Sequence, residues 1–427
     1  MSKEGGTMRK LLIAAATAAA LAPLGAYATV GYFSHGYGIK SKATGGVGIA
    51  LPQDALAAAA NPAGMAWIGN RFDLGLEWFK PDRGAEITGS PAPVNGTYDG
   101  NGTSSFFIPE FGYNHVLNPN WSLGVAVYGN GGMNTTYDTN PFAGYGGGGS
   151  SPAGVDLMQL FIAPTLAWKG GNHSFGISLN LAYQRFEANG LELFANTPGL
   201  SSNPANVTNK GYDDSTGWGV RIGWMGQVSP AVTLGATYQS KTSMSKFDNY
   251  SGLFANQGEF DIPENYGVGI AWKASPALTI AGDVLQIQYG DIPAVGNTAD
   301  CLFAGACQMG ATNGPGFGWQ NTTVYKLGVT YALSPAVTLR AGYVTLDQPI
   351  PQSQTFFNIL APGVVEDHLT LGATWKMGSN GELTLMYMHA FENTVNGSSS
   401  IPAAFGGGEA NLRMSQDSLG IAYGWKY

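Results

Sequence analysis

The sequence predicts an all-β protein: a 14-stranded antiparallel transmembrane β-barrel with its N-terminal segment as a plug inside the lumen. Three observations lead to this prediction. Apolar residues alternate with small or polar ones, tight turns alternate with long Gly-rich connections, and the chain opens with an export signal. The composition agrees, since 11% of the 427 residues are charged, 12% are aromatic and 63 are glycine. Disordered chains are excluded because they are rich in charge and poor in aromatic residues.

The composition excludes two further classes of protein. The net charge is −8 and there is no basic stripe, which argues against nucleic acid as a partner. Beyond the N-terminus no uncharged apolar run reaches the roughly 20 residues that a membrane-spanning helix needs, so a polytopic helical membrane protein is excluded as well.

Residues 1–28 have the features of a secretory signal peptide. Arg9 and Lys10 precede the apolar stretch 11–24, and Ala26-Tyr27-Ala28 is an A-x-A cleavage site. We therefore expect cleavage near Ala28 and export of an acidic chain. A single membrane anchor is the alternative, and either Met1 or Met8 is the start.

Residues 29–70 do not alternate as strands do. Residues 45–48 are glycine-rich, and 53–60 is a short alanine-rich helix that ends at Asn61-Pro62, because a residue before proline avoids the helical region. A segment of this length with little charge fits inside the barrel as a plug. The alternative is a disordered N-terminal extension.

The barrel is expected to occupy residues 71–427. In the last segment, Leu419, Ile421, Tyr423 and Trp425 alternate with small or polar residues, and the chain ends on Tyr427. Such alternation predicts one face towards lipid and one towards a wet lumen, with aromatic residues at the membrane interface.

Repeated tight turns mark one end of the barrel. The pattern Ser-Pro-Ala begins at Ser229, Ser275 and Ser334 and leads directly into a strand each time, whereas the other connections are long. The strand through Pro81 is kept whole because bacterial barrels have an even strand number. Expected strands lie near 71–90, 104–117, 120–130, 156–169, 173–188, 216–228, 231–245, 262–274, 276–290, 321–333, 336–347, 366–377, 381–393 and 415–427. The alternative is a soluble multi-domain β protein.

Several motifs resemble the FadL/TodX family of outer-membrane transporters of long-chain fatty acids and other hydrophobic compounds. They are 31-GYFSHGYG-38, 45-GGVG-48, Gln53-Asp54-Ala55, Asn61-Pro62-Ala63-Gly64 and 356-FFNILAPGVVEDH-368. The resemblance implies a monomeric barrel plugged by an N-terminal hatch over residues 29–70. It also implies ligand capture by loops, binding inside the barrel, and release through a hatch shift and a lateral opening. Asn61, Pro62 and Ala63 form the hatch motif by this resemblance, although a simple helix stop would need the same residues.

Two loops carry apolar clusters that are candidates for ligand capture. The residues are Leu191, Leu193 and Phe194 in one loop and Phe247, Leu253 and Phe254 in the other. Exposed apolar loops mark binding or membrane contact. The alternative is that the two loops pack on each other as a lid.

A fatty carboxylate would also need a cation inside the barrel. Alternation places Arg221, Lys241, Lys326 and Arg340 on the lumenal face, and we take Arg221, Lys326 and Arg340 as the candidates. Asp73, Glu77, Asp283 and Glu382 share that face, so structural ion pairs are the alternative. If all the cations are paired, an uncharged ligand such as an aromatic hydrocarbon or alkane is favoured.

Nothing in the sequence indicates catalysis, a cofactor or a metal site. There is no G-x-S-x-G and no H-E-x-x-H, and the five histidines have no ligand-like spacing. Cys301 and Cys307 lie in one loop of an exported chain, which predicts a disulfide. The expected function is passive uptake of hydrophobic compounds across the bacterial outer membrane, in contact with membrane lipid. A general porin for polar solutes and a surface adhesin are the alternatives from other classes.

Overall fold

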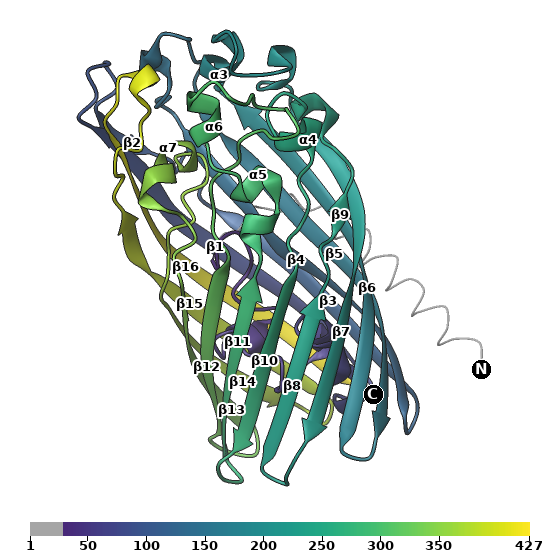
Figure 1. The fold of residues 1–427 in the computed structure, drawn as a ribbon. Coiled ribbons are helices and arrows are strands. Elements are labelled where there is room, and N and C mark those ends of the chain that lie inside the picture. The colour runs from purple at the N-terminus through teal and green to yellow at the C-terminus, as the bar shows by residue number, and fades with distance from the viewer. Residues whose placement is uncertain (1–28) are drawn as a thin grey trace.

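The structure is a computed structural model that describes residues 29–427, so the predicted signal peptide lies outside the described residues. Strand β1 (Arg71–Thr88) pairs along its whole length with β16 (Glu409–Lys426), which closes the sheet into a barrel (Figure 1). Of the 16 strands in the sheet, β2 and β9 only flank β1 and β7, which leaves 14 antiparallel strands in the closed wall. The predicted fold class is confirmed.

The remaining elements follow in chain order. The other strands are β2 Gly96–Asp99, β3 Phe106–Asn118, β4 Trp121–Tyr137, β5 Ala153–Gly170, β6 His173–Asn189, β7 Asp213–Gln227, β8 Val232–Gln239, β9 Ser243–Met244, β10 Asn265–Lys273, β11 Leu278–Ile287, β12 Thr322–Ala332, β13 Val337–Leu346, β14 His368–Met377 and β15 Gly381–Val395. The short helices are α2 Ile39–Lys42, α3 Glu192–Asn196, α4 Ala255–Gly258, α5 Pro293–Gly296, α6 Asp300–Phe303 and α7 Thr355–Asn358. The 3₁₀ turns are η1 Ala55–Ala59, η2 Pro62–Trp67, η3 Ala143–Tyr145, η4 Pro204–Asn206, η5 Asp248–Tyr250, η6 Tyr289–Asp291, η7 Gln352–Gln354 and η8 Ala403–Phe405.

The two ends of the barrel differ as predicted. At the repeated turns, the Ser229 hydroxyl accepts hydrogen bonds from the backbone of Ala231 and Val232, and Ser275 and Ser334 repeat this arrangement. The long connections gather at the opposite end, which is the upper end in Figure 1. No helix among the described residues is long and apolar enough to span a membrane.

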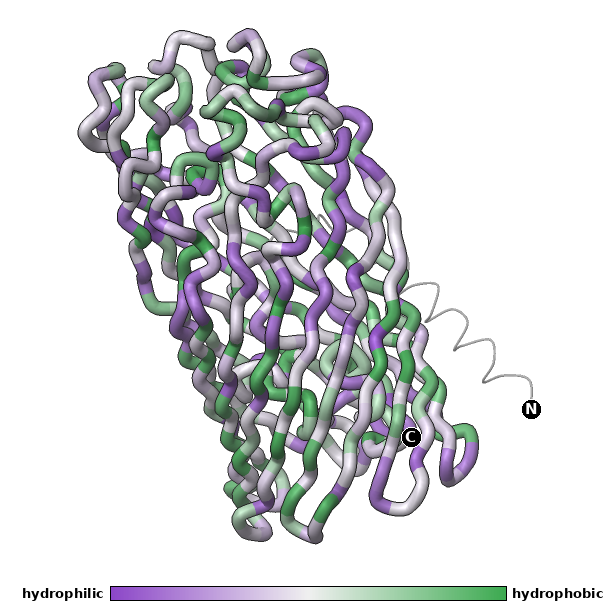
Figure 2. Tube along the Cα trace, viewed as in Figure 1, coloured by the Kyte–Doolittle hydropathy of each residue, from purple (hydrophilic) through white to green (hydrophobic). Residues whose placement is uncertain are grey.

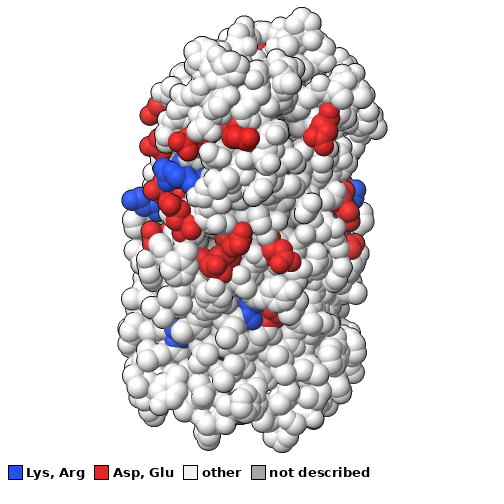
Figure 3. Space-filling model, turned by 60° about the vertical axis from the view of Figure 1, so that its left-hand side comes forward, with Lys and Arg blue, Asp and Glu red and all other residues white. Residues whose placement is uncertain are grey.

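The alternation of side chains changes sense along the barrel. Towards the short turns, outward residues are apolar, as with Leu419 and Ile421, which are 49% and 47% exposed. Nearer the loops on the same strand, Leu412 and Met414 point inward and are buried. Figure 2 shows green segments recurring along the lower strands, and in Figure 3 the charged residues concentrate above the lowest part of the barrel. Lipid therefore surrounds the lower wall, whereas the upper wall has a polar exterior and an apolar interior.

This inversion explains where the predicted strand boundaries are wrong. Strand β4 continues to Tyr137 rather than ending near 130, and β16 begins at Glu409 rather than near 415. In both extensions the apolar residues face the interior, opposite to the pattern in the lipid-facing part, so the lipid-facing alternation does not predict them as strand. Strand β8 is shorter than expected and ends at Gln239. The uninterrupted run of β1 through Pro81 is confirmed.

Residues 29–70, called the lumenal segment below, lie inside the ring of strands. Figure 1 shows them in purple within the lower half of the barrel. They contact opposite sides of the wall: η2 packs on β5, β6 and β7, whereas α2 packs on β14, β15 and β16. Most of these residues are buried and none is exposed.

Candidate functional site

Buried ion pairs hold one side of the lumenal segment against the wall. Lys42 Nζ lies 2.5 Å from Glu77 and 3.6 Å from Glu110, and Lys40 pairs with Glu382. Arg71 at the start of β1 joins Glu382 to Asp73, at 2.5 and 2.6 Å. The predicted lumenal position of Asp73, Glu77 and Glu382 is correct, and their partners come mainly from the segment itself.

Wall carboxylates also bind the backbone of the lumenal segment. Asp283 accepts hydrogen bonds from the amides of Gly48 and Ile49, at 2.8 and 3.1 Å. Glu110 accepts from Ile39 N at 2.7 Å and from Gly38 N at 3.1 Å. These carboxylates satisfy buried amides of the lumenal segment and keep their negative charge, and Asp283 lies opposite Lys326 in the register of β11 and β12.

Asn61 joins the lumenal segment to the wall at β7. Its Nδ2 donates to the carbonyls of Trp224 on β7 and Ile49, at 3.0 and 2.7 Å, while its Oδ1 accepts from Ala63 N at 3.1 Å. The side chain fits only because β7 carries glycine opposite it: a Cβ on Gly223 would lie 1.9 Å from Asn61 Oδ1. Pro62 and Ala63 lie against β6 in the same way, at Gly176.

The three cation candidates point inward without forming an ion pair among residues 29–427. Arg221 donates to Ala60 O and Gln239 Oε1, at 3.2 and 2.5 Å. Lys326 Nζ donates to His35 O and Gly46 O, at 2.7 and 3.3 Å. Arg340 donates to Gln53 and Thr374 through Nε and Nη1, at 3.1 and 2.5 Å.

Lys241 is a correction to the predicted lumenal set. It follows the end of β8, its side chain is 49% exposed, and it pairs with Asp261 at 2.7 Å in the loop region. Alternation placed it on the lumenal face only because β8 was expected to continue to residue 245.

A row of buried donors surrounds Arg221. In the sheet register Arg221 lies opposite Gln239, and Gln239 lies opposite Asn265 on β10. Within the described chain, Arg221 Nε, Gln239 Nε2 and Asn265 Nδ2 have no hydrogen-bond partner although all three residues are buried. Arg221 and Asn265 line a small cavity between the lumenal segment and the wall, together with Lys326 and Asp283. The cavity thus presents more hydrogen-bond donors than the protein satisfies, which suits an anionic group.

The sequence could not reveal this row. Gln239 and Asn265 carry no charge and lie in different strands, so only the register between β7, β8 and β10 brings them beside Arg221.

The predicted capture residues are packed together above the lumen. Leu191, Leu193, Phe194 and Phe247 are at most 2% exposed, and Phe254 is 5% exposed. They therefore do not form an open apolar surface in this arrangement. Leu191, Phe194, Leu253 and Phe254 line an apolar pocket with Phe357. Its free volume of about 40 Å³ has room for only roughly two or three water molecules, so a larger ligand requires the loops to separate.

Part of the wall between β3 and β4 lacks hydrogen bonds between the strands. Their ladder stops at Phe111↔Val127, and β4 then bulges between Gly129 and Gly131. The lumenal segment occupies this position: Gly132 N donates to Tyr32 O at 2.9 Å, and Ser34 N donates to Asn130 O at 3.1 Å. A side chain at Gly131 would collide with Tyr32 O, so this close approach requires glycine.

Other features of the loops are structural. Cys301 and Cys307 form a disulfide across the end of α6. Within residues 29–427 there is no group of three or more His, Cys, Asp or Glu side chains that could hold a metal ion.

Comparisons with known proteins identify relatives with this architecture. A family model described as outer membrane protein transport protein (OMPP1/FadL/TodX) matches residues 25–427. No curated protein matches the sequence.

Three solved structures share the fold. A Pseudomonas aeruginosa FadL homologue superposes with a TM-score of 0.70 and 16% identity, over 93% of this chain and 100% of that one. The P. putida toluene transporter TodX gives 0.69 and 18%, over 92% and 99%. The Ralstonia pickettii toluene transporter TbuX gives 0.63 and 19%, over 92% and 99%.

Proposed function

The chain belongs to the outer membrane transport proteins of the OMPP1/FadL/TodX family, and we propose that its substrates are long-chain fatty acids. Proteins of this family are transport channels for hydrophobic compounds in the outer membrane and not enzymes. Uptake is passive in this proposal, with capture at the loops, binding inside the barrel and release controlled by residues 29–70 acting as a hatch. We further propose that residues 1–28 are removed on export and that the barrel functions as a monomer.

The observation that carries the fatty acid proposal is the row of unpartnered donors beside Arg221. An aromatic hydrocarbon or alkane has no atom to accept these hydrogen bonds, whereas a carboxylate accepts several. Arg221 and Lys326 supply two positive charges at the same cavity, where neither forms a direct ion pair and Asp283, opposite Lys326, supplies one negative charge. Elsewhere in the barrel, β5 and β15 bury apolar side chains such as Leu157, Phe161 and Met388, which suit an alkyl chain.

Release is proposed to occur sideways, between β3 and β4. Here the wall lacks ladder hydrogen bonds, and Tyr32–Ser34 of the hatch cover the bulge of β4. A shift of the hatch would uncover this opening towards the lipid. Asn61 is the proposed pivot, since it fastens the hatch to β7, three strands along the wall from β4.

Two other functions are alternatives that the experiment below tests. Aromatic hydrocarbon uptake is suggested by the toluene transporters TodX and TbuX, and it would use the same apolar interior without Arg221. A porin for polar solutes or an adhesin is less compatible with a lumen that residues 29–70 fill.

The test is binding of radiolabelled oleate to the full-length barrel in lipid nanodiscs, with toluene and hexadecane as competitors. We expect saturable binding that unlabelled oleate displaces and the hydrocarbons do not. Arg221→Met should weaken binding by about 2 kcal/mol, roughly thirtyfold in Kd, because it removes a charge-assisted hydrogen bond. The control is Lys376→Met, an exposed cation near the short turns.

Displacement of oleate by toluene with no effect of Arg221→Met would move the assignment to uncharged hydrocarbons. Absence of saturable binding by any apolar compound would reject the hydrophobic-channel proposal and favour a porin or an adhesin.

A further inference from the structure

Four lysines stand at equivalent positions around the lower mouth of the barrel, and each directly follows a tryptophan. The pairs are Trp168-Lys169 on β5, Trp272-Lys273 on β10, Trp375-Lys376 on β14 and Trp425-Lys426 on β16. The backbone amide of each lysine donates to a carbonyl at a neighbouring short turn, at 2.7 to 2.9 Å, and the acceptors are Asn120, Ala231, Ala336 and Asn380. The four strands are four, four, two and four steps apart around the closed wall, so these lysines, called the lysine rim below, surround the mouth.

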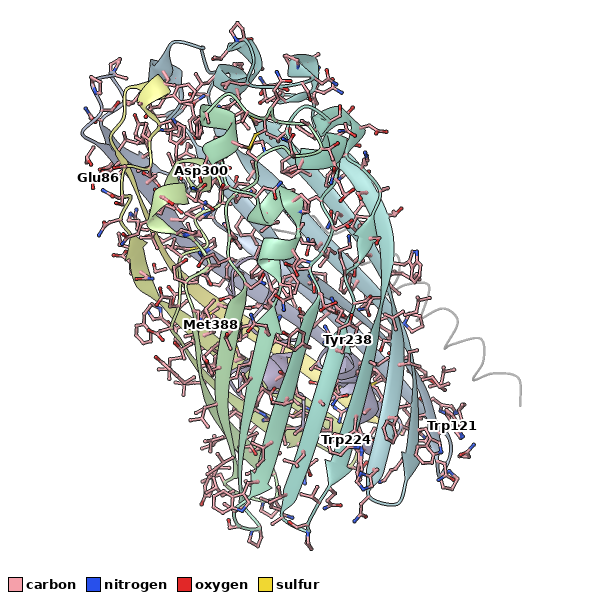
Figure 4. The ribbon with its side chains drawn as sticks, viewed as in Figure 1. Glu86, Trp121, Trp224, Tyr238, Asp300 and Met388 are labelled. Carbon is pink, nitrogen blue, oxygen red and sulfur yellow. A yellow bond between two sulfur atoms is a disulfide. The ribbon has the colours of Figure 1, made fainter. Side chains whose placement is uncertain are left out.

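The lysine rim faces the mouth and not the lipid. Side chains alternate along a strand, and the residues two positions before the lysines share their face and are buried; they are Ala167, Ala271, Thr374 and Gly424. The tryptophans occupy the opposite face and are exposed, where lipid surrounds the lower wall. Figure 4 places Trp121, the cross-strand neighbour of Trp168, at this lower end. This alternation argues against a lipid headgroup as the partner of the rim, because the leaflet meets the tryptophans instead.

The positive charge of the rim is not compensated by the protein. Among residues 29–427 no rim lysine forms an ion pair, and Glu382, opposite Lys376 in the register, already pairs with Lys40 and Arg71. The short turns carry no Asp or Glu; they are residues 119–120, 171–172, 228–231, 274–277, 333–336 and 378–380. Exposed carboxylates lie towards the loops, where Figure 4 labels Glu86 and Asp300. The mouth therefore attracts anionic partners.

The floor inside the rim is apolar. The lumenal segment contributes Leu51, Pro52, Trp67 and Ile68, which are all partly exposed. Trp67 is fixed beside a short turn, because its Nε1 donates to Ser174 at 2.8 Å and Lys169 Nζ lies 3.5 Å from the centre of its ring. An apolar centre within a ring of cations is complementary to a protein surface with an apolar centre and carboxylates around it.

The mouth has the size of a small protein interface. Fourteen strands about 4.8 Å apart and tilted by roughly 40° enclose a ring ~28 Å across, an area of roughly 600 Å². A standard interface takes ~800 Å² from each partner, and transient complexes take less. A small anion reaches only part of such a rim, whereas a globular protein covers all four lysines.

We propose that the lysine rim and its apolar floor form a docking surface for an acidic protein of the periplasm, which the short turns of outer-membrane barrels face. Opposite charges attract this partner from a distance, and the apolar floor selects among acidic proteins. The inference goes beyond the proposed function, because it concerns a protein partner and holds for any substrate of the channel.

The first test measures binding of a synthetic helical peptide, with leucine on one face and glutamate on the other, to the full-length protein in phosphatidylcholine nanodiscs. The rim variant combines Lys169→Gln, Lys273→Gln, Lys376→Gln and Lys426→Gln. It should weaken peptide binding about fifteenfold, roughly twofold for each exposed ion pair. The charge-matched control combines Lys80→Gln, Lys210→Gln, Lys241→Gln and Lys246→Gln, which are exposed lysines of the upper wall and loops, and should leave the Kd unchanged. Equal weakening by both variants would show an effect of net charge alone and reject the docking surface.

The second test looks for the partner in intact cells, with p-benzoylphenylalanine in place of Ser379, an exposed residue of the turn after Lys376. Irradiation should yield an adduct with a periplasmic protein of acidic isoelectric point. The rim variant should lose this adduct and the charge-matched control should keep it. No adduct, or an adduct that the rim variant retains, would overturn the proposal.

A third measurement separates a protein partner from lipid and from the proposed function. Adding phosphatidylglycerol to the nanodiscs should change the thermal stability of the wild type and of the rim variant equally; a stabilisation that only the rim variant loses would assign the rim to lipid and reject the docking surface. The rim variant should also bind oleate as the wild type does. Peptide docking without oleate binding by any barrel rejects the proposed function alone, and oleate binding without peptide docking rejects the docking surface alone.

Discussion

Gly223→Ala is predicted to release the hatch from β7 without disturbing the barrel. An added Cβ would lie 1.9 Å from Asn61 Oδ1 and 2.9 Å from its Cγ, so the amide must leave its position. Asn61 then loses the hydrogen bonds to Trp224 O, Ile49 O and Ala63 N. Only the bond to Trp224 O joins the hatch to β7, whereas the other two lie within residues 29–70. The hatch therefore loses about 1 kcal/mol of its attachment, which shifts its docking equilibrium by roughly fivefold.

The assay is ion conductance of single channels in planar bilayers, because a displaced hatch opens a water path. We expect Gly223→Ala to conduct measurably more often than the wild type. The matched control is Gly282→Ala, where an added Cβ meets only Lys326 O at 3.4 Å and should change nothing. If correctly folded Gly223→Ala barrels conduct no more than the control, Asn61 does not hold the hatch.

Three further predictions concern the upper barrel and its loops. Arg83→Met removes a buried guanidinium that donates to Asn134 O and Thr103 O, both at 2.7 Å, and should destabilise the barrel by about 3 kcal/mol. The loss is measured as a lower heat-modification temperature on gels, and replacing the more exposed Arg413 by methionine should not cause it. Replacing Cys301 and Cys307 by serine should cost the loop ~2 kcal/mol of chain-entropy stabilisation and speed its proteolysis; an unchanged proteolysis rate would show that packing alone holds α6. Burial raises the pKa of Glu192, but hydrogen bonds from Ser150 and Asn209 outweigh this and lower it overall. The contact with Ser150 should therefore be complete above the ordinary pKa of glutamate and be lost as the pH falls through the lowered value, and a spin label on α3 that gains mobility already near neutral pH would contradict this.

The sequence indicated most of the wall. Alternation located the strands, because a strand with two different surroundings repeats every two residues, and the Ser-Pro-Ala turns marked one end of the barrel. The count of 14 also needed the even strand number of bacterial barrels, which keeps the strand through Pro81 whole. The same alternation placed the side chains of Asp73, Glu77 and Asp283 on the inward face. The extensions to Tyr137 and Glu409 did not follow, since water replaces lipid outside the upper barrel and reverses which face is apolar.

The candidate site was predicted only in part. Arg221, Lys326 and Arg340 could be placed in the lumen one by one, but their lack of ion-pair partners could not, since Lys40, Lys42 and Arg71 take several of the nearby carboxylates. The apolar loop residues were identified as a group, but their burial depends on contacts between distant loops.

By itself, the sequence determined the barrel, its lipid-facing surface and the low charge of the segment that fills it, because each depends on local periodicity or composition. Only the tertiary structure decided which cations lack partners, where Asn61 is fastened and where the wall lacks hydrogen bonds. These properties depend on register across strands that are far apart in the chain, such as Arg221 opposite Gln239 and Gln239 opposite Asn265, and on the fit of side chains against glycines such as Gly223.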